Sequence, residues 1–163
     1  MKSFEYKPKE IEMGVGCMKL GYWTDMYGAP DMGHWIWSGV GPYDPRGCVG
    51  FCYVIQNKTT NRKYIGCKVY HFQSGKKVKQ SDWRTHCGSN KQLQSEIEKY
   101  GKGNFSFLIL SNHPTKTDMR YQEARLIIDS NAIYSEEFYN ELLFVRIKHQ
   151  KKSVIKNNKS VSS

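Results

Sequence analysis

The sequence predicts a mixed α/β domain. Two apolar runs, Phe51–Ile55 and Lys63–Val69, flank a polar turn, which is the pattern of a β-hairpin. Phe105–Leu110 is a further, nearly continuous apolar run of strand length. Lys91–Tyr100 has the apolar spacing of a helix, and a second helix is expected after the third apolar run. The 163 residues fit one domain with an appendage.

Charge and cysteine content narrow the class of protein. The formal net charge is +10 and the pI is about 9.4, which indicates a polyanionic partner, most often nucleic acid. No apolar run is long enough to span a bilayer and no signal peptide is evident, so we expect a cytoplasmic protein with no membrane partner. The odd count of five cysteines indicates reduced thiols. Cys48, Cys52, Cys67 and His71 do not have the spacing of common structural zinc sites.

Composition divides the chain into three parts. Residues 1–46 are rich in Gly, Trp, Tyr and Met with several prolines, and we predict an irregular N-terminal extension packed on the main domain. An accessory surface for DNA or a partner is the alternative, and His34–Trp37 could form a strand. Residues 47–145 are the predicted main domain. Residues 146–163 are rich in Lys, Asn and Ser and predict a basic disordered tail that attracts phosphates without sequence preference.

The hairpin carries a tyrosine on each strand. Side chains alternate between the faces of a strand, so Tyr53 shares a face with Phe51 and Ile55, and Tyr64 shares a face with Gly66 and Lys68. From these residues alone, the plain structural interpretation is a pair of half-buried strand tyrosines.

The segment after the hairpin is basic. Val69–Gln80 is expected to be a loop that carries Lys76, Lys77 and Lys79. Ser81 or Asp82 is a good helix N-cap and Gly88 a good stop, which predicts one or two helical turns between them. Arg84 and His86 lie two residues apart, so they do not share a helix face squarely, although each could point toward a site.

The two longer predicted helices differ in the side chains that form their apolar stripe. In Lys91–Tyr100, Leu93, Ile97 and Tyr100 form an ordinary apolar stripe, and Gly101 supplies the C-cap. In the helix capped by Thr115 or Thr117, the stripe contains a carboxylate. Its members are Met119, Glu123, Leu126 and Ile127.

Glu123 is unusual because desolvating an unpaired carboxylate costs several kcal/mol. Two interpretations are open. Glu123 forms a buried pair with an arginine such as Arg84 or Arg120, or it faces an electropositive cleft in which a divalent cation compensates its charge.

The amino-acid sequence of the hairpin resembles a known family signature. Phe51-Cys52-Tyr53 followed by Tyr64-Ile65-Gly66 is similar to the two tripeptides that name the GIY-YIG nuclease superfamily, and the second tripeptide matches letter for letter. The order of elements from Gly50 to Leu143 is also that of the family. The Gly-x-x-Asn-Phe-Ser-Phe segment that begins at Gly101 looks most like the phage-encoded, Seg-type branch of free-standing homing endonucleases. The resemblance implies a small three-stranded antiparallel sheet flanked by helices.

The resemblance also implies roles for individual residues. Tyr53 and Tyr64 match the motif tyrosines, one of which acts as general base or orients the attacking water. Glu123 matches the single metal-binding carboxylate, and Asn140 matches a late asparagine that supports the site. Arg84 and His86 occupy the places of a catalytic arginine and histidine. The family spacing of that pair is not kept, because Asp82 stands four residues before His86; Arg84, Lys79 or Lys68 would supply the cation.

We therefore expect a DNA endonuclease that uses Mg²⁺ or Mn²⁺, is homing-type and acts in the host cytoplasm if phage-encoded. Lys68 could lower the pKa of a tyrosine so that it serves as a base. Double-strand cleavage would need a homodimer on DNA or successive nicks. The alternatives are a non-catalytic nucleic-acid-binding protein and a module that binds a host enzyme through residues 1–46. The lysines expected to contact DNA are Lys76, Lys77, Lys79, Lys91, Lys148, Lys151 and Lys152.

Overall fold

The predicted hairpin is the centre of the main sheet in the computed structural model, which describes residues 31–148. Strand β2 (Gly50–Asn57) pairs antiparallel with β3 (Lys63–Val69). The turn between them is held by Asn57, whose side-chain oxygen accepts hydrogen bonds from the backbone of Thr59 and Thr60 at 3.0 and 3.2 Å. The register pairs Tyr53 with Gly66, Ile55 with Tyr64 and Phe51 with Lys68, so the predicted shared face is confirmed.

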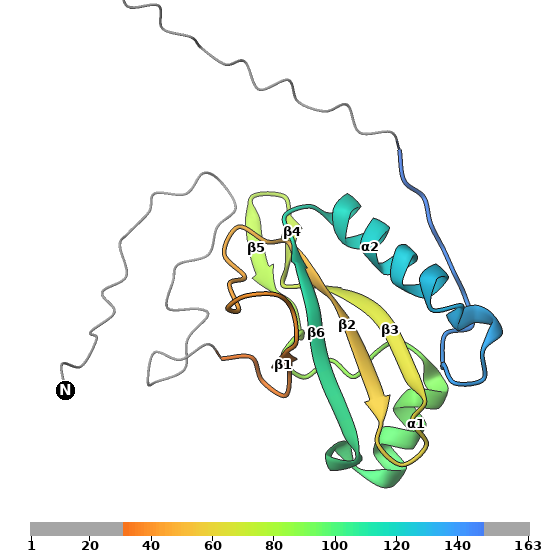
Figure 1. Cartoon of the computed structure of the whole chain (residues 1–163). Coiled ribbons are helices and arrows are strands. Elements are labelled where there is room, and N and C mark those ends of the chain that lie inside the picture. Colours follow the sequence, from red (N-terminus) through yellow and green to blue (C-terminus); the bar gives the residue numbers. More distant parts are fainter. Residues whose placement is uncertain (1–30, 149–163) are drawn as a thin grey trace, which may run out of the picture.

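The main sheet has four strands rather than the expected three. Strand β6 (Phe105–His113) lies antiparallel on the other side of β2, and β1 (Ile36–Trp37) pairs parallel with β6, which gives the order β1-β6-β2-β3 (Figure 1). The extra strand follows from Trp35, which is buried and packs edge-on against Phe51 and Phe107. Burial of this ring fixes the next two residues beside β6.

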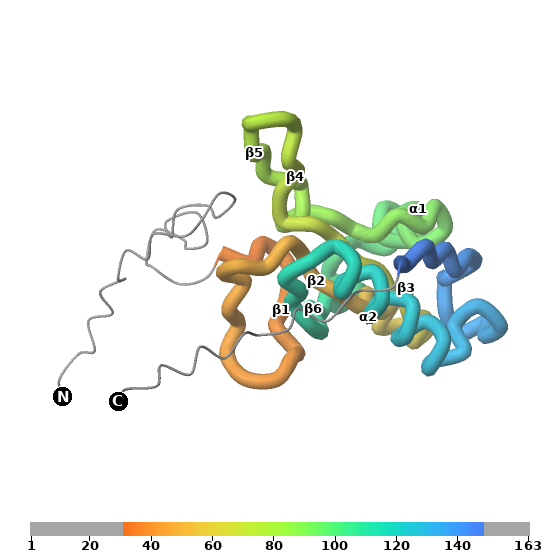
Figure 2. Tube along the Cα trace, turned by 90° about the horizontal axis from the view of Figure 1, so that it is seen from above, coloured from red at the N-terminus to blue at the C-terminus, as the bar shows by residue number. Residues whose placement is uncertain are grey.

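One helix covers each face of the sheet (Figure 2). Helix α1 (Lys91–Tyr100) places Leu93 and Ile97 in the core on the Tyr53 side, while Tyr100 is half-exposed at its end rather than buried. Helix α2 (Lys116–Asp129) packs Ile127 against Ile65 on the opposite side. Asn90 caps α1, and Thr115, rather than Thr117, caps α2 through the backbone N–H of Asp118 at 3.1 Å.

The segment predicted as a basic loop is a second β-hairpin. Strands β4 (His71–Ser74) and β5 (Lys77–Gln80) pair antiparallel, and Gly75 has a φ of 59° at the turn, a conformation that favours glycine. The helical turns predicted for residues 81–88 are also wrong. A turn replaces them, because the Ser81 hydroxyl accepts from the Trp83 backbone N–H at 3.2 Å and burial of the Trp83 ring holds the chain against the core.

Short 3-10 segments, η2 (Lys102–Asn104) and η3 (Ala132–Tyr134), complete the order of elements. Residues 31–46 contribute β1 and Trp35 to the sheet and core; the division of the chain at residue 46 stays a prediction. Residues 1–30 of the predicted extension and 149–163 of the predicted basic tail lie outside the described residues. Within residues 31–148, none of the helices has the length and apolar character needed to cross a bilayer.

Candidate active site

Tyr53 lies flat across the neighbouring strand, and a glycine makes this possible. A Cβ atom at Gly66 would stand 2.5 Å from the Tyr53 hydroxyl oxygen, so any larger residue there would displace the phenol. Tyr53 is buried, with its ring in the aromatic core beside Trp35. Its hydroxyl lies 3.3 Å from His86 Nε2. The third residue of the Tyr-Ile-Gly tripeptide therefore lets the first hairpin tyrosine reach the outer strand.

His86 joins Tyr53 to a lysine. Lys68 Nζ lies 3.3 Å from His86 Nδ1 and 2.6 Å from Asp82 Oδ1. An ammonium group can only donate, so Nδ1 must accept and the ring hydrogen sits on Nε2, where it points to the Tyr53 hydroxyl. Burial and the Lys68 charge lower the pKa of His86 to about 4, which agrees with a neutral ring. The direction of each hydrogen bond is therefore defined: Lys68 donates to Asp82 and to His86 Nδ1, and the His86 Nε2–H donates to the Tyr53 hydroxyl.

Tyr64 lies on the same face and is partly accessible. Its hydroxyl is 2.7 Å from the Ser89 hydroxyl, and its ring packs against Gly88. Burial raises the pKa of Tyr64, and burial raises that of Tyr53 still further. The expected lowering of a tyrosine pKa by Lys68 is not observed, because the ammonium group is directed at Asp82 and His86. Both phenols are therefore protonated at neutral pH.

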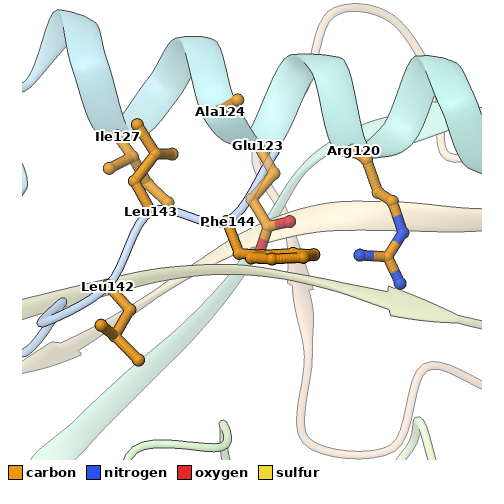
Figure 3. Close-up of a pocket in the computed structure, with 7 residues that line it drawn as sticks. All are labelled: Arg120, Glu123, Ala124, Ile127, Leu142, Leu143 and Phe144. Carbon is orange, nitrogen blue, oxygen red and sulfur yellow. The ribbon is translucent and has the colours of Figure 1, made fainter. Parts of the chain in front are cut away.

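Glu123 points from α2 toward the opposite face of β3. The Cys67 thiol donates to Glu123 Oε2 at 3.0 Å. The half-buried carboxylate lines a pocket of about 180 Å³, and Figure 3 shows Glu123 and Arg120 extending from the helix on the same side. The other residues that line this pocket are Ala124, Ile127, Leu142, Leu143 and Phe144.

Neither arginine considered as a structural partner pairs with Glu123. Arg84 pairs with Asp31 instead, at 2.9 Å. Arg120 lines the pocket, but in residues 31–148 the Glu123 carboxylate has no basic group within 4.0 Å. A half-buried carboxylate with a single thiol donor is a poor structural ion and a good cation ligand. The first of the two interpretations of Glu123, a buried pair with Arg84 or Arg120, is therefore wrong, and the second stays a prediction.

The donor set fits Mg²⁺ or Mn²⁺ held by a single carboxylate. The pKa of the Cys67 thiol is raised by burial and by Glu123, so the thiol stays protonated and donates rather than ligates. The described part of the chain has no group of three or more His, Cys, Asp or Glu side chains that could enclose a metal. Mg²⁺ commonly uses one or two protein carboxylates, with water and substrate phosphate completing the coordination shell.

The two halves of the site meet at the outer edge of β3. The first part of that edge is covered, because Asn140 makes two hydrogen bonds with the backbone of Ile65, at 2.9 and 2.8 Å, and Lys63 bridges to Phe138. The following stretch, from Gly66, has the hydroxyl of Tyr53 on one face and Glu123 on the other. The Glu123 charge contributes to the raised pKa of both Tyr53 and Tyr64, so the carboxylate acts on both phenols around this edge.

The basic side chains predicted for the site and for DNA contact lie in different parts of the structure. Lys68 contacts His86, whereas the Arg84 side chain is directed at the backbone and carboxylate of Asp31, and its guanidinium lies 4.5 Å from the Trp83 ring centre. Lys79 lies on β5. Of the other lysines expected to contact DNA, Lys76, Lys77, Lys91 and Lys148 are exposed, and Lys151 and Lys152 lie outside the described residues.

Several residues of the site were not singled out from the sequence. Cys67 was detectable, because alternation places it on the opposite face from Tyr64 and Lys68. Asp82 is predicted as a helix cap and as the departure from the family spacing, but not as a partner of Lys68, because that pairing depends on the second hairpin bringing residue 82 back to β3. Ser89 was also missed, and no local pattern marks it as the partner of Tyr64.

Two half-buried histidines, His34 and His86, predict a pH-dependent stability. His86 and His34 have pKa values lowered to about 4, mainly by burial, against an ordinary value of 6.5. The unfolded chain therefore binds more protons between these values, and the free energy of unfolding should fall as pH decreases from about 6.5 to about 4. Urea unfolding midpoints across this range would measure it. His86→Gln should flatten the slope in part, since His34 still titrates; an unchanged slope would contradict the assignment.

One known family matches most of the described residues. Residues 35–143 match the family model described as "Putative endonuclease segE, GIY-YIG domain". No curated protein and no solved structure gives a significant match to the chain. The matched range contains both hairpin tyrosines, Lys68, His86, Glu123 and Asn140. The chain belongs to the GIY-YIG nuclease superfamily, in its Seg-like branch.

Proposed function

We propose that this protein is a divalent-metal-dependent DNA endonuclease of the homing type, encoded by a phage. The observation that carries the proposal is the half-buried carboxylate of Glu123, which has a single thiol donor and lies at the same strand edge as two tyrosines and a histidine. The matched family is one of nuclease domains, and the chain has a formal net charge of +10, which favours a polyanionic substrate.

The residues of the site would divide the work on a phosphodiester as follows. Glu123 would hold the cation, whose chemistry is to withdraw charge from the phosphate and assist the departing 3′ oxygen. Lys68 would donate to a non-bridging phosphate oxygen and stabilise charge that develops there. The Tyr64 phenol, partly accessible and protonated, would orient the attacking water, while the buried Tyr53 keeps His86 in position.

Cleavage of supercoiled plasmid tests the proposal. We expect nicked product in the presence of Mg²⁺ and none when the metal is chelated. A lone site of this kind cuts one strand, so linear product should appear later or only at high protein concentration. Salt-sensitive DNA binding without cleavage of any duplex would select the non-catalytic alternative instead. Stoichiometric co-purification of a host protein would favour a protein-binding module.

Tyr64 and Tyr121 form a matched pair for mutation. Tyr64→Phe removes the hydroxyl that would orient water, and we expect the cleavage rate to fall by about 10²-fold, the lower range for a positioned proton-transfer or water-orienting group. Tyr121→Phe removes a half-exposed hydroxyl on α2 and should cleave at the wild-type rate. Single-turnover cleavage measures both, and equal rates would exclude a role for the Tyr64 hydroxyl.

A further inference from the structure

The second hairpin has the composition of a nucleic-acid contact. Residues 71–80 contain Lys76, Lys77 and Lys79 and no acidic residue. The register pairs Phe72 with Lys79 and Ser74 with Lys77, so one face of this ribbon carries an aromatic ring and two lysines, with Lys76 at the turn. Figure 2 shows β4 and β5 extending away from the main sheet on the α1 side.

The exposed apolar side chains of this hairpin do not contribute to the hydrophobic core. Phe72 is 48% exposed and Val78 is 43% exposed, and neither belongs to either core cluster. An isolated two-stranded ribbon is marginally stable in water, so its retention on this surface needs a stabilising contact or a function. Two lysines on the face of Phe72 and a third at the turn favour a nucleic acid over an apolar protein partner, because phosphates attract lysines and thymine methyl groups contact aromatic rings.

The base of the hairpin is fixed to the candidate active site. The Ser81 backbone N–H donates to the Tyr70 carbonyl at 3.0 Å, and the Ser81 hydroxyl donates to the Val69 carbonyl at 2.5 Å. Tyr70 is buried, and its hydroxyl donates to Asn112 on β6. Lys68, just before β4, pairs with Asp82, just after β5, at 2.6 Å. A ligand held by the hairpin is therefore oriented relative to Lys68 and His86.

We propose that the β4–β5 hairpin enters the major groove of duplex DNA. Lys76, Lys77 and Lys79 contact the phosphates that border the groove, and Phe72 faces the base edges. The major groove is about 12 Å wide and admits a two-stranded ribbon in undistorted B-DNA, whereas the minor groove is about 6 Å wide and is bound by such strands mainly where the duplex is bent or kinked. The inference rests on the proposed function for its duplex substrate, and it assigns to the hairpin the task of placing a phosphate beside Lys68.

The first test measures DNA binding without metal, so that no cleavage occurs. Fluorescence anisotropy of a mixed-sequence duplex, titrated at several salt concentrations, gives the slope of log affinity against log salt. Each phosphate contact contributes about 0.9 to this slope, so K77Q/K79Q should reduce it by about 2. The matched control is K99Q/K102Q, which removes the same charge from exposed residues in and just after α1, at the far end of the sheet (Figure 1). Equal slopes for the two variants would overturn the inference.

The second test locates the groove in the wild-type protein. A duplex in which 5-iodouracil replaces thymine carries its iodine in the major groove and crosslinks to nearby aromatic rings on irradiation. We expect the crosslink on the tryptic peptide that contains Phe72, and its loss in Phe72→Leu. Crosslinks confined to other peptides would overturn groove entry by this hairpin.

The outcomes separate this inference from the proposed function. Metal-dependent cleavage with an unaltered salt slope in K77Q/K79Q would reject the hairpin and leave the endonuclease standing. A Phe72 crosslink in a protein that cleaves no duplex would reject the endonuclease and leave the hairpin as a DNA contact.

Discussion

Replacing Glu123 with glutamine is expected to lower the rate of DNA cleavage by about 10³-fold, since a catalytic cation contributes several kcal/mol to the transition state and each 1.36 kcal/mol is a factor of ten. Glutamine keeps the shape of the side chain and can still accept a hydrogen bond from the Cys67 thiol, but it loses the charge that would hold the cation. The melting temperature should stay the same or rise, because the carboxylate has no basic partner within 4.0 Å in residues 31–148.

Two controls accompany the Glu123 variant. Glu98→Gln makes the same chemical change at an exposed position of α1 and should cleave at the wild-type rate. Titration of Mn²⁺ by calorimetry in the absence of DNA gives a readout independent of cleavage, and Glu123→Gln should lose the binding isotherm that the wild type shows. Full activity of Glu123→Gln would exclude this carboxylate from the site.

Local pattern was sufficient for five elements, β2, β3, α1, β6 and α2. The bounds of α1 are those predicted, Lys91–Tyr100, because its apolar spacing and Gly101 act within one helix. The β2–β3 pair was equally accessible, since alternation determines which side chains share a face once two strands are joined by a short turn. Both features depend on contacts between residues that are close in the chain.

Features that depend on distant contacts were predicted in part or not at all, since the sequence suggested a strand within His34–Trp37 but not its place beside β6. Strand β1 has two residues, and only its parallel pairing with β6, some seventy residues away, makes it a strand. The turn at residues 81–88 was predicted as helix because Asp82 and Gly88 are residues typical of helix caps. Local capping residues do not show that the Trp83 side chain packs in the core. The β4–β5 hairpin was read as a loop because lysines dominate it, although Ser74-Gly75 between short alternating runs was a turn signal.

The sequence indicated candidate site residues at positions where a residue type did not fit its surroundings. Glu123 stood out as a carboxylate on an apolar stripe, and Lys68 followed from sharing a strand face with Tyr64. Asp82, which holds Lys68, was assigned another role, because a salt bridge across the base of a hairpin cannot be read before the hairpin is recognised. Sequence reasoning identified charged side chains whose burial is energetically unfavourable, and it missed the partners that stabilise them.

Asn140→Ala is expected to destabilise the protein by about 2–4 kcal/mol, because it leaves two backbone groups of a buried residue without partners. The Asn140 side chain accepts from the Ile65 N–H at 2.9 Å and donates to the Ile65 carbonyl at 2.8 Å, so it substitutes for a further strand at the edge of β3. Ile65 separates Tyr64 from Gly66, and loosening it should misplace the Tyr64 hydroxyl and the support under Tyr53. We therefore expect a lower cleavage rate even at temperatures where the variant is fully folded.

Amide hydrogen exchange distinguishes this positioning role from general destabilisation. The Ile65 amide faces outward to Asn140, whereas alternation turns the Gly66 amide inward to β2. In Asn140→Ala at low temperature, the Ile65 amide should exchange much faster while the Gly66 amide keeps its protection. Equal acceleration of both amides would mean that the whole strand opens, and Asn140 would then be a residue of global stability. Selective loss at Ile65 together with slower cleavage would identify Asn140 as the residue that holds the Tyr-Ile-Gly edge in place for catalysis.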